Sequence, residues 1–366
     1  MEQRLYWFWL IESGLQSRKN KLLEQYGTVK AIYEMYVMDK STIEKRECKW
    51  FPSEDEIEDR IADYEKKGIS FCSIDDMEYP RLLREIYDAP CGLYYRGRLP
   101  KEKHSIAVVG ARGCTDYGKR LSEKTAEDLV LSGVGVISGM ALGIDGSAHK
   151  GALFPWKNSL TSEQEAILGR TYAILGNGVD VCYPRTNRSL YDLLVTYGGI
   201  LSEYPPGTPS IPSNFPRRNR IISGMSEGIL VVEARKRSGS LITAELGLEQ
   251  GRNIYAFPGR PDDVLSEGCN YLIQNGAKLV LNAQDILSDF DFEQRVYMDY
   301  GKIPKIILET TEKMVYACLR LEPKHINQIF QESGLSWNEV MSILLKLELK
   351  GYAEQTTLDY YVLSRR

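Results

Sequence analysis

The sequence lacks the features that mark several common classes of protein. No stretch approaches the roughly 20 consecutive apolar residues of a membrane-spanning helix, and the first residues lack the order of a signal peptide. Seven cysteines occur at irregular spacing and never as Cys-x-x-Cys, which argues against a disulfide framework and a zinc site. We therefore expect a cytoplasmic protein with buried thiols, no membrane partner, and neither a metal nor a cofactor.

The sequence also offers few groups for catalysis. It has no G-x-x-x-x-G-K-[ST] phosphate loop, and its three histidines, His104, His149 and His325, are scattered. Asp145 and His149 are four residues apart, which suits an acid/base pair on one helix face but equally suits a structural hydrogen bond or a packed histidine. We expect no catalytic residues, and hence a binding protein and not an enzyme.

The length and charge of the chain limit its organisation. A chain of 366 residues exceeds one ordinary domain, so two or three domains are expected. The net charge of -4 argues against a protein that coats nucleic acid through bulk electrostatics, although a local basic groove remains compatible with it.

Residues 79–290 alternate short apolar runs with helical stretches, which is typical of a parallel sheet covered on both faces. The predicted strands are Ile106–Val109, Val134–Ile137, Tyr172–Leu175, Gly199–Ser202, Ile229–Val232, Ile254–Phe257 and Lys278–Leu281. The pattern predicts an α/β fold with a Rossmann-like, doubly wound, mostly parallel sheet.

The flanking regions differ from this centre. Residues 1–75 have helical spacing and are predicted to form a small helical domain, either a simply packed one or a helix-hairpin-helix-like one that contacts the DNA backbone. Residues 156–170 suggest an inserted polar loop, and 291–305 a linker. Residues 306–366 have the element order of a winged helix, with seven acids and seven bases from Thr311 onward, so either duplex DNA or a protein is its expected partner.

Small residues follow several of the predicted strands. In an open α/β sheet these strand ends line one crevice, where glycine lets the backbone approach a ligand and helix N-termini attract anions. Ordinary turns explain one or two such glycines, whereas this repetition favours an extended ligand that carries phosphates. The residues in question are Gly110, Arg112, Ser138, Gly139, Gly176, Asn177, Ser238, Gly239 and Ser240. The turn at Gly110 departs from G-x-G-x-x-G, so NAD is not expected.

A basic cluster lies between Asn214 and Thr243. Phe215 is followed by Arg217, Arg218, Asn219 and Arg220, and three more basic residues occupy 235–237. Aromatic faces stack bases and guanidinium groups bind phosphates, so the cluster suits single-stranded nucleic acid. A solvated charged face beside a core strand is the alternative interpretation.

Taken together and in order, these motifs resemble the DprA/Smf family of DNA-processing proteins. The matching stretches are Val109–Arg112, Ser138–His149, Ala173–Gly176, Tyr183-Pro184, Ser202–Tyr204, Phe215–Arg220, Val232–Ala234, Ser238–Ala244 and Phe257–Gly259. The resemblance implies a protein that binds single-stranded DNA without catalysis, forms a homodimer through its Rossmann-like domain, protects incoming DNA and loads the RecA recombinase during natural transformation.

The resemblance also implies roles for individual residues. Arg112 is expected to hold a phosphate, the turns at Ser138-Gly139 and Gly176 to donate backbone N–H groups, and Phe215 to stack a base. Arg217, Arg218 and Arg220 belong to the same motif, where some are expected to pack or to pair with Glu203 or Glu233. Leu142 and Pro212 stand where family members often have basic residues, which removes two potential phosphate contacts.

Two other functions remain open at this stage. The fold resembles that of cytokinin-activating phosphoribohydrolases. Residues Ser238–Glu245 of this chain imitate the glycine-rich phosphate turn of those enzymes but lack part of its glycine pattern. A nucleotide hydrolase is therefore the main alternative, and the missing glycines favour binding over catalysis. A regulator that reads duplex DNA through the winged helix is disfavoured by the neutral charge of that region.

Overall fold

The computed structural model describes residues 2–38, 48–157, 165, 167–290, 310–320, 322–350 and 352–363. The chain forms two compact units, Met1–Arg295 and Val296–Arg366. The predicted linker 291–305 lies outside the described residues, as does most of the predicted loop 156–170. The start of that loop is different from the prediction. Residues Trp156 and Lys157 form the end of a helix, and Trp156 is buried. The predicted boundary between residues 75 and 79 stays a prediction.

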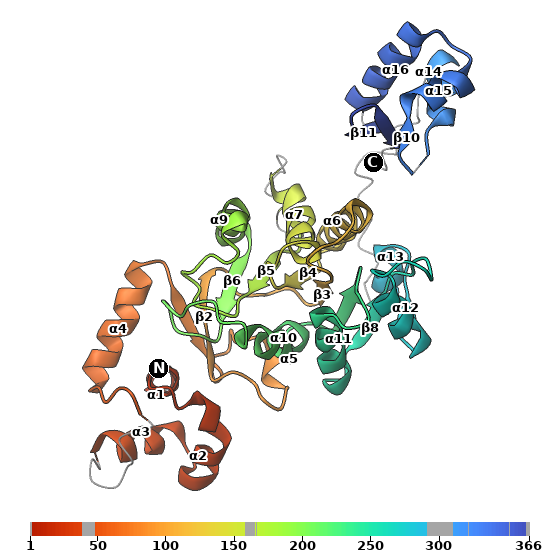
Figure 1. The fold of residues 1–366 in the computed structure, drawn as a ribbon. Coiled ribbons are helices and arrows are strands. Elements are labelled where there is room, and N and C mark those ends of the chain that lie inside the picture. Colours follow the sequence, from red (N-terminus) through yellow and green to blue (C-terminus); the bar gives the residue numbers. More distant parts are fainter. Residues whose placement is uncertain are drawn as a thin grey trace. The chain divides into compact units, whose positions relative to one another are not determined.

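A nine-stranded sheet runs through the first unit in the order β1-β2-β6-β5-β4-β3-β7-β8-β9 (Figure 1). Neighbouring strands from β6 to β9 pair in parallel, whereas β1 pairs with β2 and β2 with β6 in antiparallel register. The seven predicted strands and the predicted fold class are confirmed. The strand bounds are β1 (Ser70–Ser73), β2 (Gly92–Gly97), β3 (Ser105–Val109), β4 (Gly135–Ser138), β5 (Thr171–Ile174), β6 (Gly199–Ser202), β7 (Gly228–Val231), β8 (Asn253–Ala256) and β9 (Lys278–Leu279).

Side chains alternate between the two faces of each strand, so the sheet packs against helices on both faces. On β3, Ile106 and Val108 pack on one side of the sheet and Ala107 and Val109 on the other, as the two-residue period of a strand requires. Helices α5 (Arg81–Arg84), α10 (Asn214–Gly224), α11 (Gly239–Glu249) and α12 (Glu267–Gln274) cover the Ala107 side. Helices α6 (Asp116–Leu131), α7 (Ile144–Lys157) and α13 (Ala283–Leu287) cover the Ile106 side, and α9 (Arg188–Tyr197), which follows the turn η2 (Arg185–Asn187), packs on β5 and β6.

The N-terminal region is helical, as predicted, and belongs to the same compact unit as the sheet. It contains α1 (Glu2–Glu12), the 3-10 turn η1 (Gln16–Arg18), α2 (Lys19–Tyr26), α3 (Val29–Met38) and α4 (Glu54–Lys66). Residues 6–11 of α1 are all buried, so this helix lies inside the group and is not an amphipathic surface helix. A capping box begins α4, because Ser53 Oγ accepts from Glu56 N while Glu56 Oε2 accepts from Ser53 N at 2.7 Å.

Aromatic contacts join these helices to the antiparallel edge of the sheet. The Phe8 ring of α1 is fully buried and meets Phe71 of β1 edge-on at 5.2 Å and Tyr94 of β2 at 5.8 Å between centroids. Glu12 accepts a hydrogen bond from the Tyr94 hydroxyl at 2.7 Å and pairs with Arg60 at 3.2 Å. The first helix and the sheet edge therefore share one core.

The second unit is a winged helix, which confirms the prediction for the C-terminal region. It consists of α14 (Thr310–Cys318), β10 (Lys324–His325), α15 (Ile326–Ser333), α16 (Trp337–Leu349), β11 (Ala353–Thr357) and β12 (Tyr360–Leu363), with strand order β10-β12-β11. Gly334 ends α15 at a φ of 68°, where a side chain would be strained. Ser336 and Glu339 form the capping box that begins α16.

The shared core predicts the effect of truncating Phe8. The Phe8→Ala variant is expected to lower the free energy of unfolding of the first unit by about 3–5 kcal/mol, because it empties a site closed by rigid aromatic rings. Urea unfolding followed by tryptophan fluorescence measures this loss. Phe8→Leu keeps most of the volume and should cost clearly less. A loss below about 1 kcal/mol for the alanine variant would mean that α1 is not part of the core of the sheet.

Candidate nucleic-acid interface

The strand order of the large sheet reverses between β3 and β7. From β3 the chain moves through β4 and β5 to β6, then returns to the other side of β3 to form β7. Helix α6, after β3, and helix α11, after β7, pack on opposite faces of the sheet. Their diverging starts leave a crevice at the carboxyl ends of these two strands, which is where open α/β sheets bind ligands.

A cavity of about 420 Å³ occupies this crevice. It brings together eight of the predicted site residues: Gly110, Arg112, Phe215, Arg218, Asn219, Ser238, Gly239 and Ser240. They come from the turn after β3, the turn after β7 and the helix α10, which are far apart in the sequence. The predicted crevice is therefore present, and binding of DNA by these residues stays a prediction.

An exposed cation and an aromatic ring lie together in this cavity. The Arg112 guanidinium is exposed and lies 5.7 Å from the centroid of the half-buried Phe215 ring. A Cβ on Gly176 would come within 3.1 Å of that ring, so the glycine makes room for Phe215. Ser238 caps α11, and its hydroxyl lies 2.6 Å from that of Ser240. The cavity thus offers a guanidinium, a ring face and a helix N-terminus to one ligand.

Arg218 forms the base of the cavity and is buried, with only 4% of its surface exposed. Its Nη1 donates to the carbonyl of Gly139 at 3.1 Å and to that of Ile174, and its Nε donates to Asn219 Oδ1 at 3.3 Å. Burial lowers the pKa of Arg218 to about 10, and the nearby carboxylate of Asp145 opposes this shift. Burial likewise raises the pKa of Asp145 against the charge of Arg218.

Four predicted residues lie behind the cavity and do not line it in the described structure: Ser138, Gly139, Gly176 and Asn177. Ser138 Oγ donates to the Val108 carbonyl at 2.6 Å, and Asn177 Nδ2 donates to the Val181 carbonyl at 2.7 Å. The backbone N–H of Gly139 serves the Asp145 carboxylate. Ser138 Oγ, Asn177 Nδ2 and the Gly139 N–H thus have partners within the protein, and binding of DNA by these four residues stays a prediction.

Arg220 and Arg217 face a different part of the surface. Arg220 Nε pairs with Asp88 at 2.7 Å and its Nη2 with Glu203 at 2.6 Å, which confirms the expectation that Glu203 orients an arginine. Glu233 accepts hydrogen bonds from the backbone N and the hydroxyl of Thr115. Arg217 is exposed, and both arginines line a second cavity.

The candidate catalytic groups have structural partners. His149 is buried with Nδ1 2.6 Å from the Thr171 hydroxyl, and burial lowers the pKa of His149 to about 3, so it does not form an acid/base pair with Asp145. A G-x-S-x-G sequence occurs at 224–228, but it joins a helix to a strand and its Ser226 is buried against the Ile222 carbonyl. Among the described residues no cluster of His, Cys, Asp and Glu could hold a metal, and no helix could span a membrane. All seven cysteines are free thiols.

The comparisons with known proteins agree with this geometry. Residues 70–291 match the family described as DNA recombination-mediator protein A, and residues 304–357 match the DprA winged helix domain. Protein Smf of Synechocystis sp. is 35% identical over 331 residues, which cover 81% of this chain and 80% of the relative. DNA processing protein DprA of Streptococcus pneumoniae is 46% identical over 228 residues, which cover 62% of this chain and 76% of the relative. The chain belongs to the DprA/Smf family.

Solved structures of DprA proteins also resemble this chain. DNA processing protein A of Streptococcus pneumoniae matches with a TM-score of 0.59 and 35% identity over 78% of this chain and 94% of that one. The second match is to DNA processing protein A of Helicobacter pylori, whose structure is described as giving insight into a unique single-stranded DNA binding mode. It has a TM-score of 0.52 and 26% identity over 60% of this chain and 97% of that one.

The site of this DprA/Smf chain contains an aromatic residue that the sequence reasoning did not select. Tyr183 lines the cavity, is 41% exposed, and lies 5.5 Å from Phe215 between ring centroids at an interplanar angle of 31°. Its motif Tyr183-Pro184 was part of the family resemblance, but its spacing from Phe215 gave no sign that the two rings meet. The cavity therefore has two adjacent ring faces.

Helix α16 of the winged helix presents an apolar stripe. Trp337, Met341, Leu345 and Leu349 recur every four residues, and each is between 41% and 81% exposed. The Phe330 ring of α15 extends the stripe by an edge-on contact with Trp337 at 5.6 Å. A surface that reads duplex DNA is normally basic, whereas this one is mainly apolar.

Because Arg218 is buried, we expect its replacement to lower the stability of the protein, apart from any effect on binding. The Arg218→Met variant leaves Asp145 buried without its cation and is expected to lose about 3–5 kcal/mol of unfolding free energy. Because the loss of Arg218 raises the pKa of Asp145 further, the folded variant takes up a proton as the pH falls. The difference in unfolding free energy between the original protein and the variant should then be smaller at about pH 5 than at about pH 8.

Urea unfolding at the two pH values measures this deficit. The matched control is the double variant Arg218→Met/Asp145→Asn, which has no buried carboxylate and should recover part of the loss with little dependence on pH. An Arg218→Met variant that is as stable as the original protein at both pH values would contradict the assignment of Arg218 as the partner of Asp145.

Proposed function

We propose that this protein binds single-stranded DNA without a chemical step and acts as a recombination mediator. The observation that carries the proposal is the cavity at the β3/β7 crevice, where the exposed Arg112 guanidinium lies beside the Phe215 and Tyr183 rings. Rings stack the unpaired bases of a single strand, and guanidinium groups bind its phosphates. A duplex does not offer its base faces to such rings.

Family membership supports the same function. The family is named for recombination mediation, and the structure of the Helicobacter pylori relative concerns the binding of single-stranded DNA. On this basis we extend the proposal to the protection of incoming DNA and the loading of RecA during natural transformation, in the cytoplasm. We further propose a homodimer formed through the Rossmann-like sheet. Exposed apolar side chains near the edge strand β9 support this: Leu279 on β9, Leu281 just after it and Tyr271 on α12 are each at least 46% exposed.

For the winged helix we propose contact with a protein and not with duplex DNA. The exposed stripe on α16 and the balance of seven acids with seven bases support this choice. Apolar side chains gain free energy by leaving water against another apolar surface, but they gain little against phosphates.

The nucleotide-hydrolase alternative has less support from the cavity. Asp145 is the carboxylate in its described lining, and it already accepts hydrogen bonds from backbone N–H groups and lies near the charge of Arg218. Glu245 follows the Ser238 turn in the position of the hydrolases' glutamate, but it is not part of that lining. A general base needs a free carboxylate within hydrogen-bond reach of the substrate, so binding is the better-supported function.

The proposal predicts a preference for single strands. Fluorescence anisotropy with labelled poly-dT and a duplex of equal length, at two salt concentrations, is expected to show tighter, salt-dependent binding of the single strand. Equal binding of both, or binding of neither, would overturn the proposal. In that event, release of ribose 5'-phosphate from nucleoside monophosphates tests the hydrolase alternative.

Replacing Arg112 or Phe215 is expected to change the binding in different ways. Arg112→Ala removes one phosphate contact and should lower the salt slope by about 0.7. Phe215→Ala removes stacking and should cost about 1–3 kcal/mol without changing the slope. Arg120→Ala, an exposed change on α6 away from the cavity, is the matched control. Unchanged slope and affinity in both folded variants would place the DNA elsewhere.

A further inference from the structure

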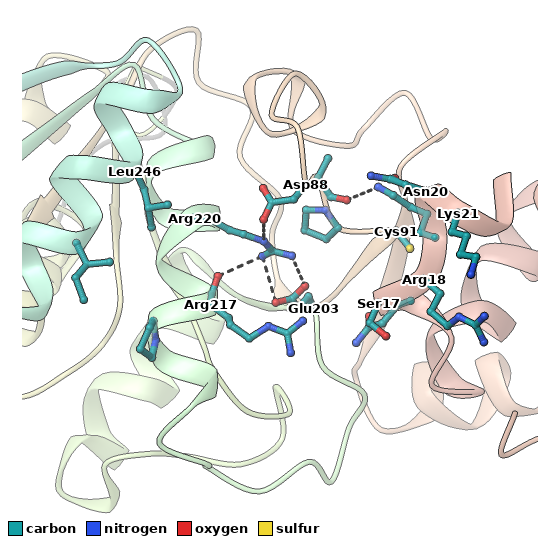
Figure 2. A pocket seen from close by; sticks show the side chains of 16 residues that line it. Ser17, Arg18, Asn20, Lys21, Asp88, Cys91, Glu203, Arg217, Arg220 and Leu246 are labelled. Atoms are coloured by element: carbon teal, nitrogen blue, oxygen red, sulfur yellow. Dashed lines mark hydrogen bonds and ion pairs between the residues drawn. The ribbon is translucent and has the colours of Figure 1, made fainter. Parts of the chain in front are cut away.

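A second cavity, of about 660 Å³, lies between the N-terminal helices and α10. One wall comes from residues 16–21, which form η1 and the start of α2, and the facing wall from α10 (Figure 2). Figure 2 shows the side chain of Arg217 extending from α10 toward Ser17 on the opposite wall. Both walls belong to the same compact unit, so the cavity lies within that unit.

The lining of this cavity is positively charged although the chain as a whole is negative. Five cations line it, and the two acids that line it, Asp88 and Glu203, are both bound to Arg220. The five cations are Arg18, Lys19, Lys21, Arg217 and Arg220. Five positive and two negative charges leave an excess of three positive charges, in a protein with a net charge of -4. Such a local excess concentrates polyanions.

The second cavity adjoins the cavity that contains Phe215. Pro216 and Ile242 line both cavities, so the two hollows share a wall at the start of α10. The sequence Phe215-Pro-Arg-Arg places consecutive residues on either side of that wall: Phe215 and Arg218 line the first cavity, and Arg217 lines the second. A strand that leaves the Phe215 ring over Pro216 enters the second cavity directly.

We propose that the second cavity holds the phosphate backbone of a single strand that continues from the Phe215 site, with the N-terminal helices as one wall of its path. This inference rests on the proposed function and adds a second binding segment to it. Among the described lining residues of the second cavity there is no aromatic ring. Binding there is therefore electrostatic and independent of base sequence, in contrast to stacking at Phe215 and Tyr183.

Lys21 provides the sharpest test, because it lies on the N-terminal wall and lines only the second cavity. Its side chain is exposed, so its removal leaves the core unchanged. The full-length variants Lys21→Ala and Arg217→Ala and their combination are compared with Lys150→Ala. Lys150 is an exposed cation on α7 that lines neither cavity, so it controls for the loss of one positive charge.

The measurement uses oligo-dT strands of increasing length, from about 4 to about 20 nucleotides, by fluorescence anisotropy at several salt concentrations. For long strands, each single variant is expected to bind about 3- to 10-fold more weakly and to show a salt slope lower by about 0.7. For the shortest strands, which the Phe215 site alone accommodates, the variants should bind like the original protein. Lys150→Ala should match the original protein at every length.

The possible failures distinguish this inference from the proposed function. If Lys21→Ala and Arg217→Ala bind long strands with unchanged affinity and slope while Arg112→Ala is weakened, the second segment is wrong and the proposed function stands. An equal loss on short and long strands would also overturn the inference, because it would place these residues at the Phe215 site. If the original protein binds no single strand of any length, both proposals fail.

Discussion

The arrangement of the site depends on one buried cation. Arg218 joins its helix α10 to two other segments of the chain, because it bonds to the carbonyls of Gly139 and Ile174 and lies near Asp145, which closely follows Gly139. Charges are buried only when such partners compensate their lost hydration. The orientation of α10 is fixed in consequence, and with it the positions of Phe215 above the β5 turn and of Arg217 on the opposite side. A buried arginine thus determines where the accessible side chains of the site lie.

The fold could be predicted in large part from the sequence because parallel strands buried on both faces leave a strong pattern. Seven apolar runs separated by helices required crossover connections, and crossovers imply a doubly wound sheet. Strands β1 and β2 gave no such sign. They extend the sheet by antiparallel pairing, which needs no crossover helix. β1 also lies at the end of the region 1–75, which otherwise has helical spacing.

The site was predicted at the level of the crevice but not of each side chain. Strand-end glycines and serines mark the correct edge of the sheet, yet periodicity cannot show whether an arginine beside Phe215 points outward or inward. Arg217, Arg218 and Arg220 are adjacent in the motif, but helical geometry directs one to solvent, one to the base of a cavity and one to a pair of carboxylates. Tyr183 was overlooked for the same reason, since its partner ring is distant in sequence.

The aromatic junction at the sheet edge also bears on how the protein can be dissected. The family match begins at residue 70, which is the first residue of β1. A fragment that begins there would keep all nine strands but lose Phe8, and would leave Phe71 and Tyr94 uncovered beside the outermost strand. Uncovered apolar side chains on an unpaired edge favour strand-to-strand association between molecules. We therefore expect that a fragment starting where the family match begins will associate with itself and be poorly soluble, whereas the chain that includes α1 will not. The start of the family match is then not the start of an independently folding unit.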